Sequence, residues 1–164
     1  MSPYGPGPAL KLLLTKKTLL AILLLGIVAV PVVFFFLSYH SVNGTHVELV
    51  KVFRTPGPTS ATFHVEAHVW SWAGSLETHV NALTFNLVVD SFPIETMTVT
   101  GGSFQPHGYI SYNLRFQTND YQVATAVDER DSNTIVLTMT AIANAGMYGQ
   151  VLTRSDSAVE NWTD

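Results

Sequence analysis

The chain of 164 residues contains no cysteine. Disulfide bridges are therefore excluded, and any folded domain must be stabilised by its hydrophobic core, which about 120 residues can supply. The same absence removes a cysteine nucleophile and the thiolate ligand of a copper electron-transfer site. A secreted eukaryotic module without cysteine is unusual, which mildly favours a prokaryotic source.

Catalytic motifs are also lacking. There is no G-x-S-x-G nucleophile motif, and the serines cluster in loops. The glycine-containing stretch "GGSFQPHG" is not followed by the Gly-Lys-Ser/Thr of a phosphate-binding loop. We therefore expect no enzymatic activity and no bound cofactor.

Basic residues are scarce beyond the amino-terminal part of the chain. Residues 46–164 hold all 12 acidic residues and five of the eight basic ones, a formal net charge of −7. Nucleic-acid phosphates require clustered Lys and Arg, so this composition argues against nucleic acid as a partner. It also disfavours electrostatic docking of this segment onto anionic lipid.

Charge is missing altogether from residues 18–39, which are dominated by Leu, Ile, Val, Ala and Phe. A bilayer core about 30 Å thick needs roughly 20 residues of α-helix, and no polar stripe marks this run as a soluble helix. The run is preceded by Lys11, Lys16 and Lys17, so the positive-inside rule places the amino terminus in the cytoplasm. The prediction is a transmembrane helix with the lipid bilayer as partner and an extracytoplasmic carboxyl-terminal domain.

Two alternatives involve processing of this run. A cleaved signal peptide has a shorter apolar region and a small-x-small cleavage site, which "FFFLSYHSV" does not provide. A pilin-like leader usually has Gly or Ala after the basic residue, whereas Thr18 follows Lys17 here. Pro31 inside the run predicts a kink of the kind that membrane helices tolerate. An uncleaved anchor is therefore favoured, with processing left open.

The expected organisation has four parts. Residues 1–17 form a short cytoplasmic basic tail, residues 18–39 the transmembrane helix, residues 40–45 a short stalk, and residues 46–164 the extracytoplasmic domain. A segment of that last length is near the usual size of a single domain.

The outer segment alternates apolar and polar residues with a period of two. The alternation in "ATFHVEAHVW", "YISYNLRF" and "TIVLTMTAIA" is typical of half-buried strands, and "ALTFNLVV" with "FPIETMTV" predicts a hairpin. Residues predicted to face inward are Ala61, Phe63, Val65, Ala67, Val69, Ile110, Tyr112, Leu114, Phe116, Ile135, Leu137, Met139 and Ala141. The fold class is therefore all-β, an antiparallel β-sandwich of about seven strands preceded by one transmembrane α-helix. A helical segment near 144–152 or at the carboxyl end is only weakly signalled.

The run "NALTFNLVVDSFPIETMTVTGGSFQPHGYISYNLRF" resembles the late embryogenesis abundant group 2 domain, also called the water-stress and hypersensitive-response domain. The resemblance matches Leu83–Val89 to a strand, Asp90–Ser91 to a turn, Pro93–Val99 to a second strand, and Gln105–Gly108 to a turn before Tyr109–Phe116. The sequence departs from the family in having "WSWAGS" where Asn-Pro-Asn is common. The resemblance implies an anchored sandwich with a binding or protective role and no catalytic residues.

A histidine-containing strand is the sharpest candidate metal site. His64, Glu66 and His68 share one face, but the two histidines lie about 13 Å apart along a strand, too far for one ion. A pair of these residues with a ligand from a neighbouring strand, such as His79 or His107, stays open. A solvent-facing polar surface is the favoured interpretation, so no metal is predicted here.

The stretch "DERDSN" offers oxygen ligands suited to calcium at Asp128, Glu129, Asp131 and Asn133. It lacks the Asp-x-Asp-x-Asp-Gly rhythm of an EF-hand loop, so a charged turn between strands is favoured.

Aromatic residues suggest an interaction surface. Trp70, Trp72 and Tyr148 are candidates for an exposed patch that contacts a protein partner, a second copy of the chain, or lipid headgroups. Two acceptor patterns for N-glycosylation occur, at Asn43 and Asn161.

The sequence thus predicts a single-pass membrane-anchored protein whose extracytoplasmic sandwich has a binding or structural role. One alternative is a subunit of a surface filament with the apolar helix in its core. Another is an accessory subunit of a membrane enzyme complex, with Pro31 and Phe34–Phe36 facing a partner helix. A metal-dependent enzyme is the least favoured alternative.

Overall fold

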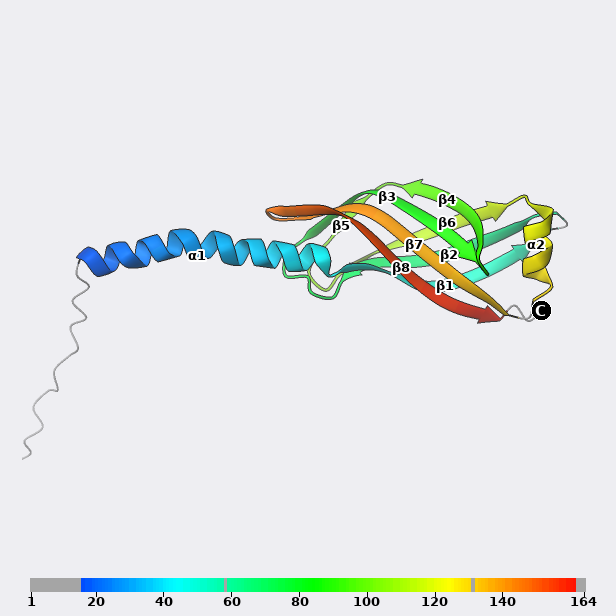
Figure 1. Cartoon of the computed structure of the whole chain (residues 1–164), viewed down its shortest axis with the longest axis horizontal. Helices are drawn as coiled ribbons and strands as arrows, with labels where there is room; N and C mark the ends of the chain where they lie inside the picture. Colours follow the sequence, from blue (N-terminus) through cyan, green and yellow to red (C-terminus); the bar gives the residue numbers. More distant parts are fainter. Residues whose placement is uncertain (1–15, 58, 131, 162–164) are drawn as a thin grey trace, which may run out of the picture. The chain divides into compact units, whose positions relative to one another are not determined.

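The computed structural model describes residues 16–57, 59–130 and 132–161. Within them the chain forms two helices and eight strands (Figure 1). The elements are α1 (Lys16–Asn43), β1 (Thr45–Pro56), β2 (Ala61–Ser71), β3 (Thr78–Val89), β4 (Phe92–Val99), β5 (Gly102–Phe104), β6 (Tyr109–Thr118), α2 (Tyr121–Asp128), β7 (Ser132–Ala145) and β8 (Tyr148–Asn161). The predicted class, an all-β sandwich preceded by one helix, is confirmed.

The chain divides into two compact units, Met1–Val33 and Phe34–Asp164. The first unit contains most of α1. The second contains the last turns of α1 together with all the strands.

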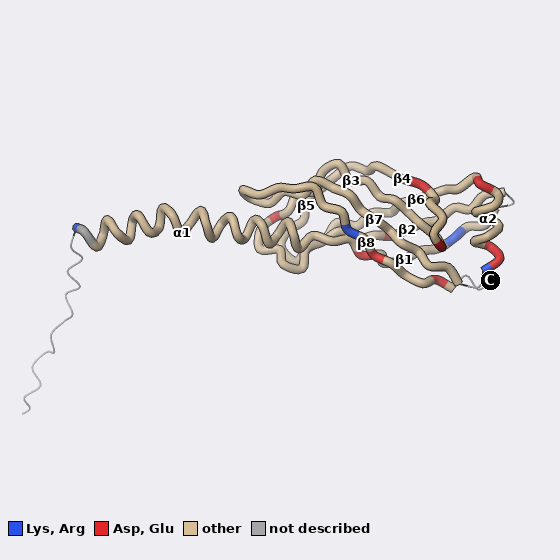
Figure 2. Tube along the Cα trace, in the orientation of Figure 1, with Lys and Arg blue, Asp and Glu red and all other residues tan. Residues whose placement is uncertain are grey.

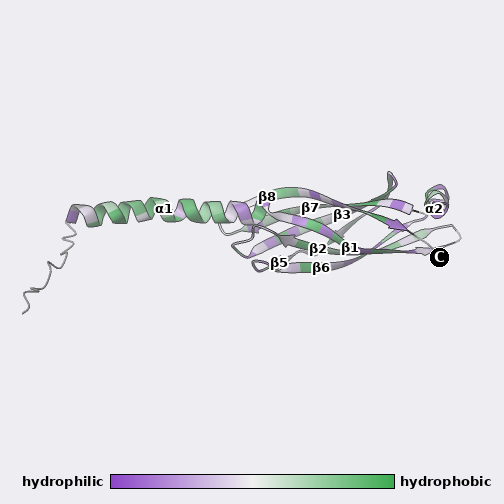
Figure 3. Cartoon of the chain, turned by 90° about the horizontal axis from the view of Figure 1, so that it is seen from below, coloured by the Kyte–Doolittle hydropathy of each residue, from purple (hydrophilic) through white to green (hydrophobic). Residues whose placement is uncertain are grey.

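In the first unit α1 is apolar on every side. Figure 3 shows mostly hydrophobic positions along α1 between its hydrophilic ends. Large side chains project outward, with Leu25 73% exposed. By length and composition, Thr18–Asn43 is the one segment of the described chain able to cross a membrane as a helix.

In the second unit all strand pairs are antiparallel. One sheet has the order β1-β2-β6, and the other has the order β4-β3-β7-β8 with β5 beside β3. The predicted hairpin is β3–β4, in which Val89 pairs with Phe92 across Asp90 and Ser91. Both turn residues have positive φ, 49° and 74°, the left-handed geometry that tight hairpins require.

The inner faces of the two sheets form one core. Successive residues of β2 alternate strictly between buried and half-buried, with every inward position buried, as the period-2 pattern predicts. Phe63 and Phe116 of the first sheet are fully buried, and they meet Phe85 of β3 and Ile135, Leu137 and Met139 of β7 from the second sheet. All the inward-facing predictions are confirmed, with Ile110 and Tyr112 packed against the core while half-buried.

Three features differ from the expectations. Residues 144–152, weakly predicted as helical, form the β7–β8 turn and its flanking strands. The sequence pattern predicts no helix at Tyr121–Asp128, yet a short helix, α2, forms there. Asp120 caps it by accepting hydrogen bonds from the backbone N–H groups of Gln122 (2.9 Å) and Val123 (3.4 Å). Instead of a stalk at 40–45, residues 40–43 continue α1 and Thr45 begins β1.

The open sides of the sandwich are closed by carboxylates. On one side Asp156 of β8 accepts a hydrogen bond from the backbone N–H of Leu49 in β1 at 2.8 Å. On the other side Glu95 of β4 accepts one from the backbone N–H of Gln117 in β6, also at 2.8 Å. An edge strand otherwise offers free N–H groups to other chains, so these contacts reduce edge-to-edge association.

Replacing Asp156 by alanine should therefore accelerate hydrogen exchange at the Leu49 amide and lower the free energy of unfolding by about 1 kcal/mol. Asp156→Asn keeps a carbonyl oxygen at this position and serves as the control, with a smaller change. Hydrogen exchange followed by mass spectrometry measures the Leu49 exchange rate in both variants. An unchanged Leu49 exchange rate in Asp156→Ala would contradict the role given to this contact.

Candidate functional site

The carboxyl-terminal end of α1 is bound to the sandwich through a buried serine. The Ser41 hydroxyl oxygen accepts hydrogen bonds from the backbone N–H groups of Ser75 (3.0 Å) and Leu76 (3.1 Å). Its carbonyl oxygen accepts from the hydroxyls of Ser71 (2.8 Å) and Thr45 (3.2 Å). Ser41 is completely buried, so these four bonds replace water.

A second set of contacts satisfies the last carbonyl groups of the helix. Arg154 on β8 donates from Nε to the carbonyl of Thr45 (3.1 Å) and from a terminal nitrogen to the carbonyl of Asn43 (3.2 Å). The Gln150 side chain donates to the Asn43 side-chain oxygen at 2.7 Å. A cation at the negative end of the helix dipole adds electrostatic stabilisation to these bonds.

The β7–β8 hairpin makes the third contact, several residues before the end of the helix (Figure 1). The Ser38 hydroxyl donates to the carbonyl of Phe34 (2.8 Å) and accepts from the backbone N–H of Met147 (3.2 Å). The ring of Tyr148 lies 5.7 Å from that of Phe35 and 5.2 Å from that of Tyr39.

Small side chains make this approach possible. Ala143 and Ala145 of β7 are fully buried in a minor apolar cluster with Val42 of the helix and Leu152 of β8. Together the three contacts form a helix–sandwich junction, defined as residues 34–45 with 71–76 and 143–154. This junction fixes the end of α1 directly onto the domain.

Gly146 lies at the tightest point of the junction. Its φ is +52°, and a Cβ atom there would lie 2.6 Å from the Ser38 hydroxyl oxygen and 3.0 Å from the Phe34 ring. Gly146→Ala should therefore destabilise the second unit by about 1–3 kcal/mol. Gly26→Ala is the matched control, because a Cβ atom at Gly26 meets nothing within 4 Å. Unfolding midpoints in detergent measure both, and equal midpoints would contradict the close packing described.

The three candidate interaction residues have different environments. Trp72 is 68% exposed in the loop after β2. Trp70 is half-buried with its ring 4.0 Å from that of His46, and within the described residues its indole N–H has no acceptor. Tyr148 belongs to the junction through its contacts with Phe35 and Tyr39.

The two glycosylation patterns also differ. Both ends of the Asn43 amide are engaged, since its nitrogen donates to the carbonyl of Tyr39 (3.0 Å) and its oxygen accepts from Gln150. Thr45 of the same pattern is fully buried. In the folded protein the Asn43 amide is thus held within the junction, and glycosylation at Asn43 stays a prediction. Asn161 is exposed at the end of β8, and the rest of its pattern lies outside the described residues.

The histidine-bearing face of β2 is occupied by ring stacking. His64 stacks on Phe53 at 4.6 Å with an interplanar angle of 7°, and His68 stacks on Tyr109 at 4.1 Å. Glu66 lies 3.6 Å from the His68 ring nitrogen.

The other two candidate ligands are elsewhere. His79 is on β3 of the opposite sheet, and His107 lies in the turn before β6 with a φ of +64°. Across the described residues no group of three His, Asp or Glu side chains is placed to hold a metal ion.

Two of the candidate oxygen ligands near residue 130, Asp128 and Asn133, take part in structural contacts. Asp128 pairs with the buried guanidinium of Arg54 at 2.9 Å, and Arg54 also donates to the carbonyl of Val127 at 3.1 Å. Asn133 donates its amide to Asp90. Asp131 lies outside the described residues.

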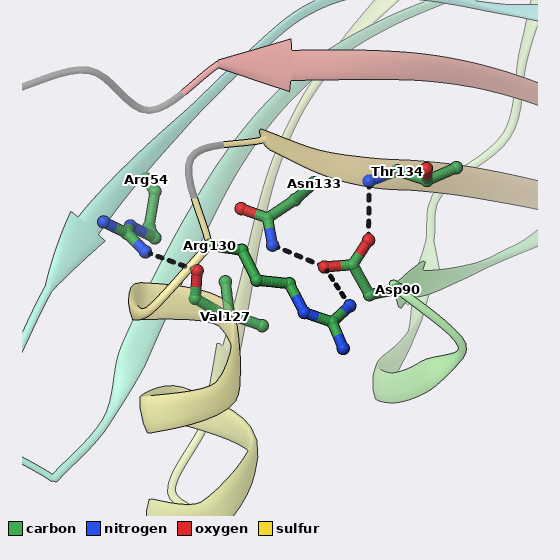
Figure 4. A network of polar contacts seen from close by, with 6 residues as sticks. All are labelled: Arg54, Asp90, Val127, Arg130, Asn133 and Thr134. Atoms are coloured by element: carbon green, nitrogen blue, oxygen red, sulfur yellow. Dashed lines mark hydrogen bonds and ion pairs between the residues drawn. The ribbon is translucent and has the colours of Figure 1, made fainter.

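Asp90 is the centre of the second contact (Figure 4). Its carboxylate, 8% exposed, accepts hydrogen bonds from Asn133, from the backbone N–H of Thr134 (2.7 Å) and from Arg130 (3.0 Å). Burial raises the pKa of this carboxyl, but these hydrogen bonds and the Arg130 charge outweigh burial and bring the pKa below its ordinary value. The arrangement locks the β3–β4 turn to β7.

A cavity of about 310 Å³ lies between α2 and the β1–β2 turn. Its wall includes Arg54, Tyr121 and Asp128. Because Asp128 pairs with Arg54, Glu129 supplies the remaining formal charge of the wall, which is polar but not strongly charged.

The sequence matches no known protein-family model and no curated protein. Similar solved structures exist. A crystal structure of a protein from Archaeoglobus fulgidus is 10% identical, with alignment over 71% of this chain and 98% of that one and a TM-score of 0.43. A solution structure of an Arabidopsis thaliana protein is 8% identical, with coverage of 70% and 80% and a TM-score of 0.52. At this identity the second likeness shows a shared fold alone. The class defined by fold and site is a β-sandwich preceded by an apolar amino-terminal helix, with the last turns of the helix packed on the sandwich.

Proposed function

We propose that this protein is a single-pass membrane protein with a cytoplasmic amino terminus and an extracytoplasmic β-sandwich that binds or supports other molecules without catalysis. The observation that carries the proposal is the contrast between α1 and the sandwich. The sandwich buries its own core, whereas large side chains such as Leu25 and Val30 of α1 are mostly exposed. Each would gain about 1.5–3 kcal/mol from an apolar environment, which lipid supplies.

The helix–sandwich junction supports a structural or display role. A flexible stalk would let the domain swing freely, whereas Ser41 and Arg154 hold the end of the helix in hydrogen bonds. The last turns of the helix and the sandwich therefore belong to one compact unit. We propose that partners bind at the surface formed by Trp70, which is half-buried, and Trp72, which is exposed.

We further propose that the domain is related to the late embryogenesis abundant group 2 domain. The resemblance of residues 81–116 supports this, and so does the β3–β4 hairpin, whose turn at Asp90–Ser91 falls where the resemblance puts it. The relation would give the chain a binding or protective role.

Topology can be tested with single cysteines because the natural chain has none. In intact cells a membrane-impermeant maleimide should label Ser157→Cys, which is exposed on β8, and should label Ser2→Cys only after lysis. The membrane fraction should retain the protein during alkaline carbonate extraction and release it into detergent. Extraction by carbonate, or the reverse labelling pattern, would refute the proposal.

The two alternatives predict other results from the same material. A filament subunit would appear as fibres in sheared surface preparations viewed by electron microscopy. An accessory subunit would co-purify in mild detergent with a stable enzyme complex.

A further inference from the structure

We infer that the tip of the β7–β8 hairpin, residues 145–149, lies in the lipid headgroup region beside the anchor and forms a second membrane contact. The inference rests on the proposed anchor and adds the surface by which the sandwich itself touches the bilayer. It has three independent grounds, and one feature limits how deep the contact reaches.

The first ground is where the hairpin meets the helix. The backbone N–H of Met147 donates a hydrogen bond to the Ser38 hydroxyl, and a Cβ atom at Gly146 would lie 3.0 Å from the Phe34 ring. At 1.5 Å rise per residue, Phe34 lies about 13 Å before Asn43, the end of α1. The hairpin tip therefore lies alongside the helix rather than beyond its end.

The second ground is the length of a membrane span. About 20 helical residues cross a hydrocarbon core of about 30 Å. Counted from Thr18, the first residue after the lysines, 20 residues end at Leu37. Phe34 and Ser38 are then at the outer boundary of the hydrocarbon, and whatever contacts them is at the same depth.

The third ground is the chemistry of the hairpin. No charged residue occurs from Ser132 to Thr153, and Figure 2 shows the hairpin end free of charged positions. Met147 is 64% exposed at the turn, and the pair Ile142–Val151 on the outer face has Val151 65% exposed. Tyr148 adds an aromatic ring of the kind enriched at membrane interfaces.

Polar groups set the depth of this contact. β8 is an edge strand, so its outward backbone groups need water or headgroups, which the hydrocarbon core does not provide. On the neighbouring loop, hydrogen bonds from Ser103 and Gln105 hold the pKa of Glu77 below its ordinary value, which favours an ionised group in water. The contact is therefore interfacial.

The test uses full-length protein carrying one cysteine coupled to an environment-sensitive NBD dye, reconstituted in phosphatidylcholine vesicles. Met147→Cys reports on the hairpin tip. Val159→Cys is the matched control, since it lies on the same strand, is 67% exposed and is far from the turn. Leu25→Cys reports on the anchor itself.

Lipids brominated on the acyl chain near the headgroup should quench dye at 147 by at least twofold, with a blue-shifted emission, and leave dye at 159 unchanged. Dye at 25 should be quenched by lipids brominated deeper in the chain. Quenching at 25 with equal, negligible quenching at 147 and 159 would overturn the inference while leaving the anchor intact. Loss of quenching at 25 would refute the anchor. If Met147→Cys fails to fold by circular dichroism, Val151→Cys replaces it with the same expected outcomes.

Discussion

Replacing Asp90 by alanine is expected to lower the free energy of unfolding by about 3 kcal/mol. The substitution removes the acceptor for the buried Asn133 amide, and an orphaned buried donor costs about 1–3 kcal/mol. It also removes the hydrogen bond from the backbone N–H of the exposed Thr134 and the ion pair with Arg130. Alanine also tolerates the φ of +49° at this position less well than aspartate. Denaturant unfolding in detergent should show a lower midpoint with an unchanged slope.

Two variants make the Asp90 measurement specific. Glu48→Ala removes an exposed carboxylate from β1 and should change stability by less than about 0.5 kcal/mol. Asp90→Asn keeps one acceptor oxygen and the tolerance for positive φ, so its free energy of unfolding should lie between those of Asp90→Ala and the natural protein. A loss below 1 kcal/mol in Asp90→Ala would show that the turn is not held by this network.

The stability contributed by Asp90 should also depend on pH. Because its pKa is lower in the folded state, the folded protein binds the proton more weakly than the unfolded chain. The contribution is therefore fully present above the ordinary carboxyl pKa of about 4 and is lost as the pH falls through the lower folded value. Unfolding midpoints measured from pH 6 to pH 2 should fall less steeply for Asp90→Asn than for the natural protein.

The strands of this fold are readable from sequence because their signal is local. In β2 every second residue from Ala61 to Val69 is buried, and the alternation is visible without knowing any partner strand. The β3–β4 hairpin is equally local, since two strands flank two turn residues. By contrast, α2 occupies only Tyr121–Asp128, too short for a clear helical period, and its Asp120 cap is also typical of a turn.

The junction could not be predicted in the same way. Ser38 and Ser41 follow an apolar run, and alone they indicate only that the run is ending. Their partners are far along the chain: Ser41 bonds to residues 34 and 35 positions away and Ser38 to one 109 positions away. Polar contacts at such separations depend on the packed fold, and for this reason residues 40–45 were expected to be a stalk.

The second large effect is expected from Ser41→Ala, which should lower the free energy of unfolding of the second unit by about 2–4 kcal/mol. The substitution leaves the backbone N–H groups of Ser75 and Leu76 without their shared acceptor in a site from which water is excluded. Ser155→Ala is the control: its hydroxyl bonds only to the exposed hydroxyl of Thr138, and replacing it should cost less than about 0.5 kcal/mol.

The consequence of Ser41→Ala should be local as well as global. The loop from Ser71 to Leu76 is bonded to the helix chiefly through Ser41, so the loop amides should exchange with solvent faster in the variant. The core amides of β3 and β7 should lose protection only in proportion to the overall change in stability. Hydrogen exchange by mass spectrometry separates these two responses. Faster exchange confined to the core, with the 71–76 loop unchanged, would mean that the helix is held by Arg154 and the β7–β8 hairpin instead.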